Sequence, residues 1–381
     1  MSGVWRVLVQ GAGIGGLTLA AALARRGVEV DVAERRAEAP HGIGLNVPAN
    51  ALGALAEIGV RGEVIAAGWP FEDLLVQDAA GKPLACIPPP PSAYGRPSNV
   101  ALGRPAYARI LRGAAETAGA RVIDGVTVAE ISQDPDGVDV RLGCAFRATT
   151  ACQAARYDLV VGFDGVRSAL RRQVSAATPV FVGSAVWRAT APRHPAVDGI
   201  VLSMSPDAKA VLTPISAESM YVAVVTAEPG NPRHDPATFL PLLRRRLAPF
   251  GGVVAELRDG LDATSRISYA PLEEVTVHEP WYRGRVVIAG DAAHASTPHL
   301  AQGGAMAVED AVVLADALTC GLPLPEALAS WDARRRPRAM FVQDMSRALL
   351  RHELGEPTTP DDDKLIALGI PGAQQRLAEQ Y

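Results

Sequence analysis

The chain has 381 residues, of which 37 are Lys or Arg and 41 are Asp or Glu, so its formal net charge is −4. This length predicts two or three domains, and the balanced charge argues against sequence-independent binding of nucleic acid. No stretch reaches the ~20 apolar residues of a membrane span, and no secretory signal precedes the first strand, so we expect a cytoplasmic protein. The four cysteines form no C-x-x-C pair and no cluster with histidine, which predicts no metal site.

The N-terminal segment predicts a β-α-β unit. Val4–Gln10 has the apolar pattern of a buried strand, Gly11–Gly16 is a glycine turn, Leu17–Arg26 is an Ala- and Leu-rich helix, and Val28–Glu34 is a second strand. A unit of this kind forms the core of a dinucleotide-binding fold.

The next part of the chain continues this alternation. After a stiff loop with four consecutive prolines, the patterns predict a helix, two strands of a hairpin and another buried strand. These segments are, in order, Cys86–Tyr94, Ala106–Ala118, Arg121–Ile131, Val138–Leu142 and Asp158–Gly162.

From about residue 178 to residue 268, short strand-like runs predict an antiparallel sheet that is interrupted by one helix near Thr238–Leu247. A buried strand at Arg285–Ala289 and a long helix at Gly303–Leu318 follow. The basic run Arg334–Arg338 contains a proline, and we expect it to be the solvated start of a helix.

The glycine turn has the pattern G-x-G-x-x-G. Gly11 permits the tight turn, Gly13 lets the backbone approach a pyrophosphate, and Gly16 lets the helix pack on the strand. Glu34 ends the next strand, where a carboxylate accepts hydrogen bonds from the ribose of an adenosine. This motif is compatible with NAD and with FAD.

A second motif, GRVVIAGDAAHASTPHLAQGGAMAVED, begins at Gly284. Its strand delivers Asp291 to the edge of a sheet, and a helix begins about a dozen residues later at Gly303 and Gly304. A flavin uses both features, because its ribityl chain has hydroxyls to anchor and its reduced ring carries negative charge that a helix N-terminus stabilises. In the same motif we expect His294 to be a structural residue bonded to the backbone.

Together with DLVVGFDGVRSALRR (Asp158–Arg172), these motifs resemble the single-component FAD-dependent aromatic hydroxylases of the para-hydroxybenzoate hydroxylase family, the group A flavoprotein monooxygenases. The resemblance implies an α/β fold, in which a Rossmann-like FAD-binding domain carries an inserted antiparallel substrate sheet and C-terminal helices. We expect residues 1–70, 101–175 and 276–340 in the FAD-binding domain, 71–100 and 176–275 in the substrate domain, and 341–381 in a helical tail.

The resemblance also implies roles for individual residues. Gly11, Gly13, Ile14, Gly15 and Glu34 would contact the ADP half of a non-covalently bound FAD. Arg104 would contact the FAD, and the backbone near Val128 would meet the adenine. Asp164, in the family's Asp-Gly turn, would lie near the pyrophosphate and take part in NAD(P)H binding. Asp291 would hold the ribityl chain, and Gln302, Gly303 and Gly304 would line the isoalloxazine.

The family implies that NADH or NADPH reduces the flavin, and that a flavin C4a-hydroperoxide made from O2 hydroxylates an electron-rich aromatic or heteroaromatic ring. The chain has no second G-x-G-x-x-G, so NAD(P)H would bind transiently in a groove. The sequence distinguishes neither NADH from NADPH nor one substrate, hydroxylated position or oligomeric state from another.

Two residues are candidates for contact with the substrate. His299 precedes the flavin-facing helix and either tunes the substrate's ionisation or is structural. Asn46 either points at the substrate or caps a turn. Relatives often have an aromatic residue near Leu212 and Thr213, and Arg188 is expected to brace the domain interface.

Other flavin-dependent functions differ from hydroxylation in their motifs. A flavin halogenase would carry a W-x-W-x-I-P signature and an active-site lysine, but the chain has no W-x-W, and its lysines (Lys82, Lys209 and Lys364) lie outside the flavin motifs. An oxidoreductase without oxygen insertion and a non-catalytic flavin-binding sensor remain alternatives.

Overall fold

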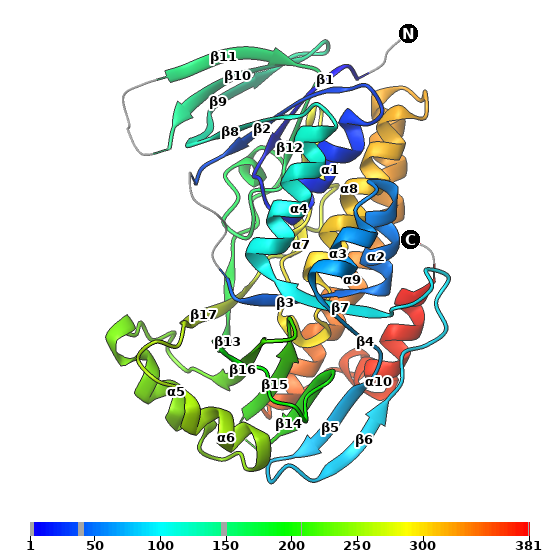
Figure 1. Cartoon of the computed structure of the whole chain (residues 1–381). Coiled ribbons are helices and arrows are strands. Elements are labelled where there is room, and N and C mark those ends of the chain that lie inside the picture. The colour runs from blue at the N-terminus through cyan, green and yellow to red at the C-terminus, as the bar shows by residue number, and fades with distance from the viewer. Residues whose placement is uncertain (1–3, 37–41, 146–150, 207, 380) are drawn as a thin grey trace.

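The computed structural model describes residues 4–36, 42–145, 151–206, 208–379 and 381, and has one region built on a mainly parallel sheet and another on a mainly antiparallel sheet (Figure 1). The first sheet has the strand order β18-β19-β12-β1-β2-β8. Strand β1 is parallel to β2 and β12, so their carboxyl ends meet at one edge of the sheet. The strands are β1 Arg6–Gln10, β2 Glu29–Glu34, β8 Arg121–Asp124, β12 Leu159–Gly162, β18 Tyr282–Arg283 and β19 Val286–Ile288.

Helices cover the parallel sheet. Helix α1 (Ile14–Ala24) packs against α8 (Gly303–Thr319) and α4 (Arg104–Thr117), as Figure 1 shows. Nine of the eleven residues of α1 are buried, which explains why its sequence is apolar all round rather than amphipathic. The β-α-β unit that the sequence predicts is confirmed.

The second sheet has the order β17-β13-β16-β15-β14-β5-β6. Helices α5 (Phe239–Leu247) and α6 (Gly252–Gly260) cover one face of it, where Trp187 and Leu212 are buried with their side chains. The opposite face is directed towards the parallel-sheet region. The strands are β5 Leu74–Asp78, β6 Pro83–Ile87, β13 Val180–Pro192, β14 Ile200–Met204, β15 Ala208–Pro214, β16 Ser219–Ala227 and β17 Ile267–Glu274.

Three predictions about individual elements need correction. The sheet is interrupted by two helices rather than one, because α6 begins at Gly252, five residues after the end of α5 at Leu247. Arg121–Ile131 is not one strand: Gly125, at φ +76°, separates β8 from β9 (Val126–Gln133). Cys86 belongs to β6, an edge strand, and the proline-rich loop starts after it.

Two small sheets complete the strands. β9 pairs with β10 and β10 with β11, whereas β7 pairs with β3 on one side and β4 on the other. The second of these sheets connects the two regions, since β3 and β7 lead into the helices α2 and α4 that pack on the parallel-sheet side. The bounds are β3 Gly44–Pro48, β4 Trp69–Phe71, β7 Asn99–Gly103, β10 Val138–Cys144, β11 Ala151–Tyr157, α2 Ala49–Glu57 and α3 Arg61–Ala67.

The basic run lies inside a helix, not at a solvated helix start. Helix α9 spans Leu324–Glu353, and α10 (Pro360–Ala378) follows it. Arg335 is fully buried, where its guanidinium contacts Glu309 at 2.7 Å and Asp310 at 2.9 Å. The prediction of a solvated run is wrong for Arg335, because two buried carboxylates on α8 attract this cation, whereas Arg334 is exposed. The expected boundary between residues 340 and 341 falls within α9.

None of the helices that the structure describes combines the length and the apolar character needed to cross a membrane.

Candidate active site

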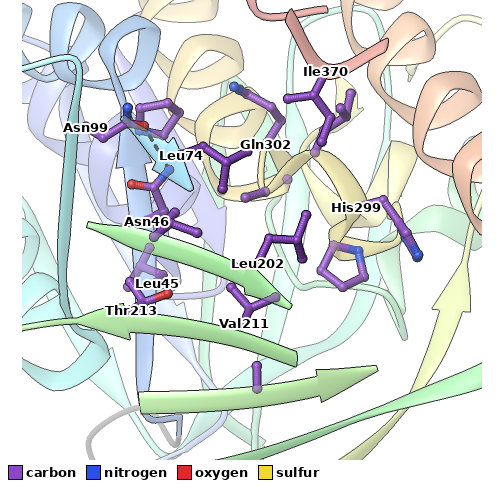
Figure 2. Close-up of a pocket in the computed structure, with 18 of the residues that line it drawn as sticks. Leu45, Asn46, Leu74, Asn99, Leu202, Val211, Thr213, His299, Gln302 and Ile370 are labelled. Carbon is purple, nitrogen blue, oxygen red and sulfur yellow. Dashed lines mark hydrogen bonds between the residues drawn. The ribbon is translucent and has the colours of Figure 1, made fainter. Parts of the chain in front are cut away.

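A cavity of about 650 Å³ lies between the carboxyl edge of the parallel sheet and the inner face of the antiparallel sheet (Figure 2). Cavities of this size hold small-molecule ligands. The parallel-sheet region contributes, among others, Ile14, Asn46, Arg104, Asp291, Gln302, Gly303 and Gly304. The antiparallel sheet contributes Arg188, Leu202, Lys209, Val211, Thr213 and Tyr221, and α10 contributes Ile370, Ala373 and Leu377.

The glycine turn leaves space at the N-terminus of α1. A Cβ on Gly11 would lie 2.4 Å from the carbonyl oxygen of Phe163, and one on Gly16 would lie 1.9 Å from that of Gly11. By contrast, a Cβ on Gly13 would meet nothing within 4 Å, and no side chain caps the helix there. The unpaired N–H groups of this helix start suit a phosphate.

The carboxylate of Glu34 lies beside this turn. Its Oε2 accepts a hydrogen bond of 2.7 Å from the backbone N–H of Ala12, which fixes the carboxylate at the end of β2. Val128 lies on β9 outside the cavity lining, and its N–H donates to Oε1 of Gln10 at 2.8 Å. If Val128 contacts the adenine, it does so through groups other than its N–H. This contact stays a prediction.

Asp164 lies against the same turn, 3.2 Å from the position of a Cβ on Gly11. One carboxylate oxygen accepts hydrogen bonds from the N–H groups of Ala169 and Leu170. The other is buried and has no partner among the described residues. Burial raises the pKa of Asp164, although these hydrogen bonds act in the opposite direction.

Asp291 and the start of α8 face the cavity together. The carboxylate of Asp291 makes no hydrogen bond to any described residue, and its Oδ1 is 3.9 Å from where a Cβ on Gly303 would be. Ile14, at the start of α1, is 3.6 Å from the corresponding position on Gly304. Two helix N-termini and one free carboxylate therefore meet around one cavity. Gln302 is buried, and its Oε1 accepts a hydrogen bond from Asn50.

Two arginines also reach the cavity. Arg104 begins α4, and its Cδ packs over Gly42, 2.4 Å from where a Cβ would be. Arg188 lies on β13, and burial lowers the pKa of its guanidinium. Neither side chain has a hydrogen-bond partner among the residues that the structure describes, so both are available to a ligand. Arg188 thus lines the cavity without the ion pair expected of a residue that braces the interface.

Asn46 lies on β3 rather than at a turn. Its Nδ2 donates to Oδ1 of Asn99 at 3.0 Å, and Figure 2 shows the two side chains together. Its own Oδ1 is buried and has no partner in the described part of the chain, and the same holds for Oγ1 of Thr213. Both atoms belong to cavity-lining residues, where an unpaired polar atom is costly unless a ligand bonds to it.

His299 lies in the short helix η3 (Pro298–Leu300), and both its ring nitrogens have partners. Nδ1 is 2.8 Å from Oγ1 of Thr297, and Nε2 is 3.2 Å from Oε2 of Glu353. Burial lowers the pKa of His299, against the effect of the hydrogen bond to Glu353. Neither nitrogen is free to take a proton from a substrate, so this geometry favours a positioning role over that of a base.

Behind the cavity, His294 is buried, and its Nε2 lies 2.7 Å from Oδ2 of Asp310. Its partner is thus a carboxylate, not the backbone group that the sequence suggested. No group of three or more His, Cys, Asp or Glu side chains in the described ranges is arranged to hold a metal ion.

The carboxylate of Glu353 makes the free energy of unfolding depend on pH. Burial would raise its pKa, but contacts with His299 and Lys209 outweigh burial and lower the pKa to about 2. A carboxylate whose pKa is lower in the folded than in the unfolded protein stabilises the fold at any pH above the unfolded pKa. This stabilisation is lost as the pH falls towards the folded pKa. We expect the difference in unfolding free energy between the wild type and Glu353→Gln to shrink from about pH 5 to about pH 2. Urea unfolding of both proteins at each pH measures this difference. A difference that stays constant with pH would contradict the lowered pKa of Glu353.

If Asp291 holds a ribityl hydroxyl, Asp291→Asn should reduce the affinity for FAD by at least tenfold, since a hydrogen bond to a charged group contributes about 1.5–3 kcal/mol. Titration of the apoprotein with FAD, followed by quenching of flavin fluorescence, measures the change. Asp361→Asn is the control, because Asp361 is an exposed residue of α10. Equal affinities for the two variants would remove Asp291 from the cofactor site.

Lys209, Glu353 and Tyr221 line the cavity but were not predicted. The sequence could have indicated Lys209, because it is the one charged residue in a strand of mostly apolar residues. Glu353 carried none, because it is distant in sequence and reaches the cavity only through the length of α9.

Comparisons with known proteins show the family to which the chain belongs. The FAD binding domain family matches residues 5–346. The chain is 29% identical to the putative FAD-dependent monooxygenase YetM of Bacillus subtilis, over 98% of this chain and 97% of that protein. It is 31% identical to the 2-heptyl-3-hydroxy-4(1H)-quinolone synthase of Pseudomonas aeruginosa, over 98% and 96% of the two chains. The solved structure of Klebsiella pneumoniae HpxO complexed with FAD and uric acid is similar, with a TM-score of 0.82, 25% identity and coverage of 100% and 94%.

Proposed function

Because the chain belongs to the FAD binding domain family and is an FAD-dependent monooxygenase, we propose that it uses NADH or NADPH and O2 to hydroxylate an electron-rich aromatic or heteroaromatic small molecule. The observation that carries this proposal is that a candidate flavin site and an apolar chamber share one cavity.

The described residues fit non-covalently bound FAD. The space over Gly13 would take the pyrophosphate, and the buried unpaired oxygen of Asp164 would lie near it. The guanidinium of Arg104, which has no hydrogen-bond partner among the described residues, would contact the FAD from the cavity wall. Asp291 would accept from the ribityl hydroxyls, and the N-terminus of α8 would face the ring. When bound and reduced, the flavin supplies the activation of O2 that oxygen transfer needs.

The chamber on the other side suits a ring. Its walls include Leu202, Val211 and Ile370, which surround the space shown in Figure 2, and Asn46 and Thr213 offer unpaired oxygens to orient a ligand. An apolar wall excludes water from the reaction, and a few polar groups fix orientation. Two relatives, named as a 2-heptyl-3-hydroxy-4(1H)-quinolone synthase and a 3-amino-4-hydroxybenzoate 2-monooxygenase, support a heteroaromatic or phenolic substrate.

Transient binding of NAD(P)H is part of the proposal. It is supported by the absence of a second dinucleotide-binding motif from the sequence. The reductant would then approach the flavin from the solvent side instead of occupying a domain of its own.

A screen of aromatic compounds tests the proposed function. The FAD-loaded protein is mixed with NADH or NADPH and each of 2-heptyl-4(1H)-quinolone, 3-amino-4-hydroxybenzoate, 4-hydroxybenzoate and uric acid, and oxidation of the reductant is followed at 340 nm. We expect at least one compound to accelerate oxidation and to yield a product that is heavier by one oxygen atom. Oxidation that no aromatic compound accelerates would favour an oxidoreductase without oxygen insertion or a flavin-binding sensor.

A further inference from the structure

Lys209 differs from the other two lysines of the chain by its burial. Lys82 and Lys364 are exposed, whereas 9% of the surface of Lys209 is accessible. It lies on β15, where side chains alternate between the two faces of the sheet. Ala210 and Leu212 point into the core under α5 and α6, whereas Lys209, Val211 and Thr213 line the cavity. A long cationic side chain is therefore placed on the wall of the chamber that we propose for the aromatic ring.

The ammonium group has more donors than protein partners. Nζ donates to Oε1 of Glu353 at 2.6 Å, and this is its one hydrogen bond to a described residue. An ammonium has three N–H donors, so two remain for a ligand. Leu202 and Met204 of the neighbouring strand line the same chamber, and low polarity strengthens the attraction between a cation and an anion there.

Glu353 and His299 hold this lysine in place. The carboxylate of Glu353, the last residue of α9, is shared between Nζ of Lys209 and Nε2 of His299. His299 is fixed in turn by Thr297, and three residues later the chain reaches Gln302 and the start of α8. The contacts therefore link the substrate-facing sheet, the end of α9 and the loop predicted to face the flavin.

We infer that Lys209 binds an oxygen anion of the aromatic substrate, and that Glu353 and His299 position its ammonium group. The substrate class is then a ring with an acidic hydroxyl or an enolisable carbonyl, which deepens the proposed function and rests on it for the identity of the reaction. On binding, the hydroxyl loses its proton to bulk solvent, and the resulting oxygen anion donates electron density to the ring. Both oxygens of Glu353 already accept hydrogen bonds, so a ligand anion meets the free donors of Lys209.

The ionisation of a bound phenol tests this inference without turnover. The probe is 4-nitrophenol, whose anion is yellow, and difference spectra against FAD-loaded enzyme at a fixed pH report the ionised fraction of the bound probe. We expect the wild type to raise the ionised fraction above that of the free probe. Lys209→Met should bind the probe at least tenfold more weakly and abolish the rise, whereas Lys209→Arg should keep it. Glu353→Gln should give an intermediate loss.

Two controls separate binding from structural damage. The ether 4-nitroanisole has no hydroxyl to ionise, so its affinity should change less than threefold between the wild type and Lys209→Met. Lys82→Met, which alters an exposed lysine, should match the wild type with both probes. An unchanged ionised fraction in Lys209→Met, or an equal loss of affinity for both probes, would overturn the inference. These outcomes are independent of the screen above, because a protein that never hydroxylates a ring can still ionise a bound phenol.

Discussion

Gly13→Asp is expected to lower the affinity for FAD about 100-fold while leaving the apoprotein folded. Gly13 is the N-cap of α1, its backbone is extended at φ −79° and ψ −173°, and a Cβ there meets no atom within 4 Å. Aspartate is a favourable N-cap, so the helix itself should be as stable or more stable. Its carboxylate, however, would take the N–H donors and repel the pyrophosphate, a loss of about 2–3 kcal/mol.

The matched control for this variant is Gly113→Asp. Gly113 is an exposed residue in the interior of α4, outside the cavity lining, and a Cβ there also meets nothing within 4 Å. Titration of the apoproteins with FAD gives the affinities, and thermal unfolding of the apoproteins gives the stabilities. Tight FAD binding by Gly13→Asp would show that the pyrophosphate lies elsewhere.

Arg335→Met should be the most destabilising single change in the helical region. The guanidinium of Arg335 is buried between Glu309 on one side and Asp310 on the other. Removing it leaves two carboxylates buried, with Arg338 and Asn50 still at Glu309 and His294 still at Asp310. Loss of one partner from such a network costs about 3–5 kcal/mol.

Denaturant unfolding measures this loss, and the neighbouring Arg334→Met is the control. Arg334 belongs to the same basic run but is exposed, so its replacement should change the free energy of unfolding by less than about 0.5 kcal/mol. We also expect Arg335→Met to weaken FAD retention, because Asp310 accepts a hydrogen bond from the N–H of Gly290, directly before Asp291. A loss of less than about 1 kcal/mol would mean that the two carboxylates find other partners.

Local sequence determines the parts of the fold that could be predicted. The β-α-β unit follows from an apolar strand, a glycine turn and an apolar helix within about thirty residues. The position of Asp291 follows for the same reason, because a buried strand ends at Ile288, three residues before it. In both cases the apolar pattern and the glycines of a short segment determine the local structure.

Long-range contacts account for the predictions that failed. Nothing local distinguishes Arg335 from its exposed neighbours, since its burial depends on Glu309 and Asp310, which precede it by about two dozen residues. The expectation that His294 bonds to the backbone failed for the same reason, because its carboxylate partner, Asp310, belongs to another helix. In the cavity, Lys209 meets Glu353 across 144 positions of sequence. Charge pairs of this kind need the tertiary structure.

The assignment of single residues to the cofactor and the substrate stays a set of predictions. Ile14 and Asp291 line the cavity, and Gly11 and Gly13 belong to the turn that precedes Ile14, with Asp164 packed against Gly11. Val128 lies apart from the cavity lining, and His299 has no free nitrogen. The variants at Gly13, Asp291 and Lys209 test the cofactor side and the substrate side separately.

Isotope labelling tests most directly whether the chain inserts oxygen into a ring. The FAD-loaded enzyme is supplied with NADH or NADPH, an accelerating aromatic compound from the screen and ¹⁸O₂, and the product is analysed by mass spectrometry. We predict one ¹⁸O atom in each molecule of product and none when ¹⁸O is supplied as water. The reductant could instead be consumed while all of the ¹⁸O is recovered as hydrogen peroxide or water and the aromatic compound stays unlabelled. That result would contradict the insertion of oxygen into the ring.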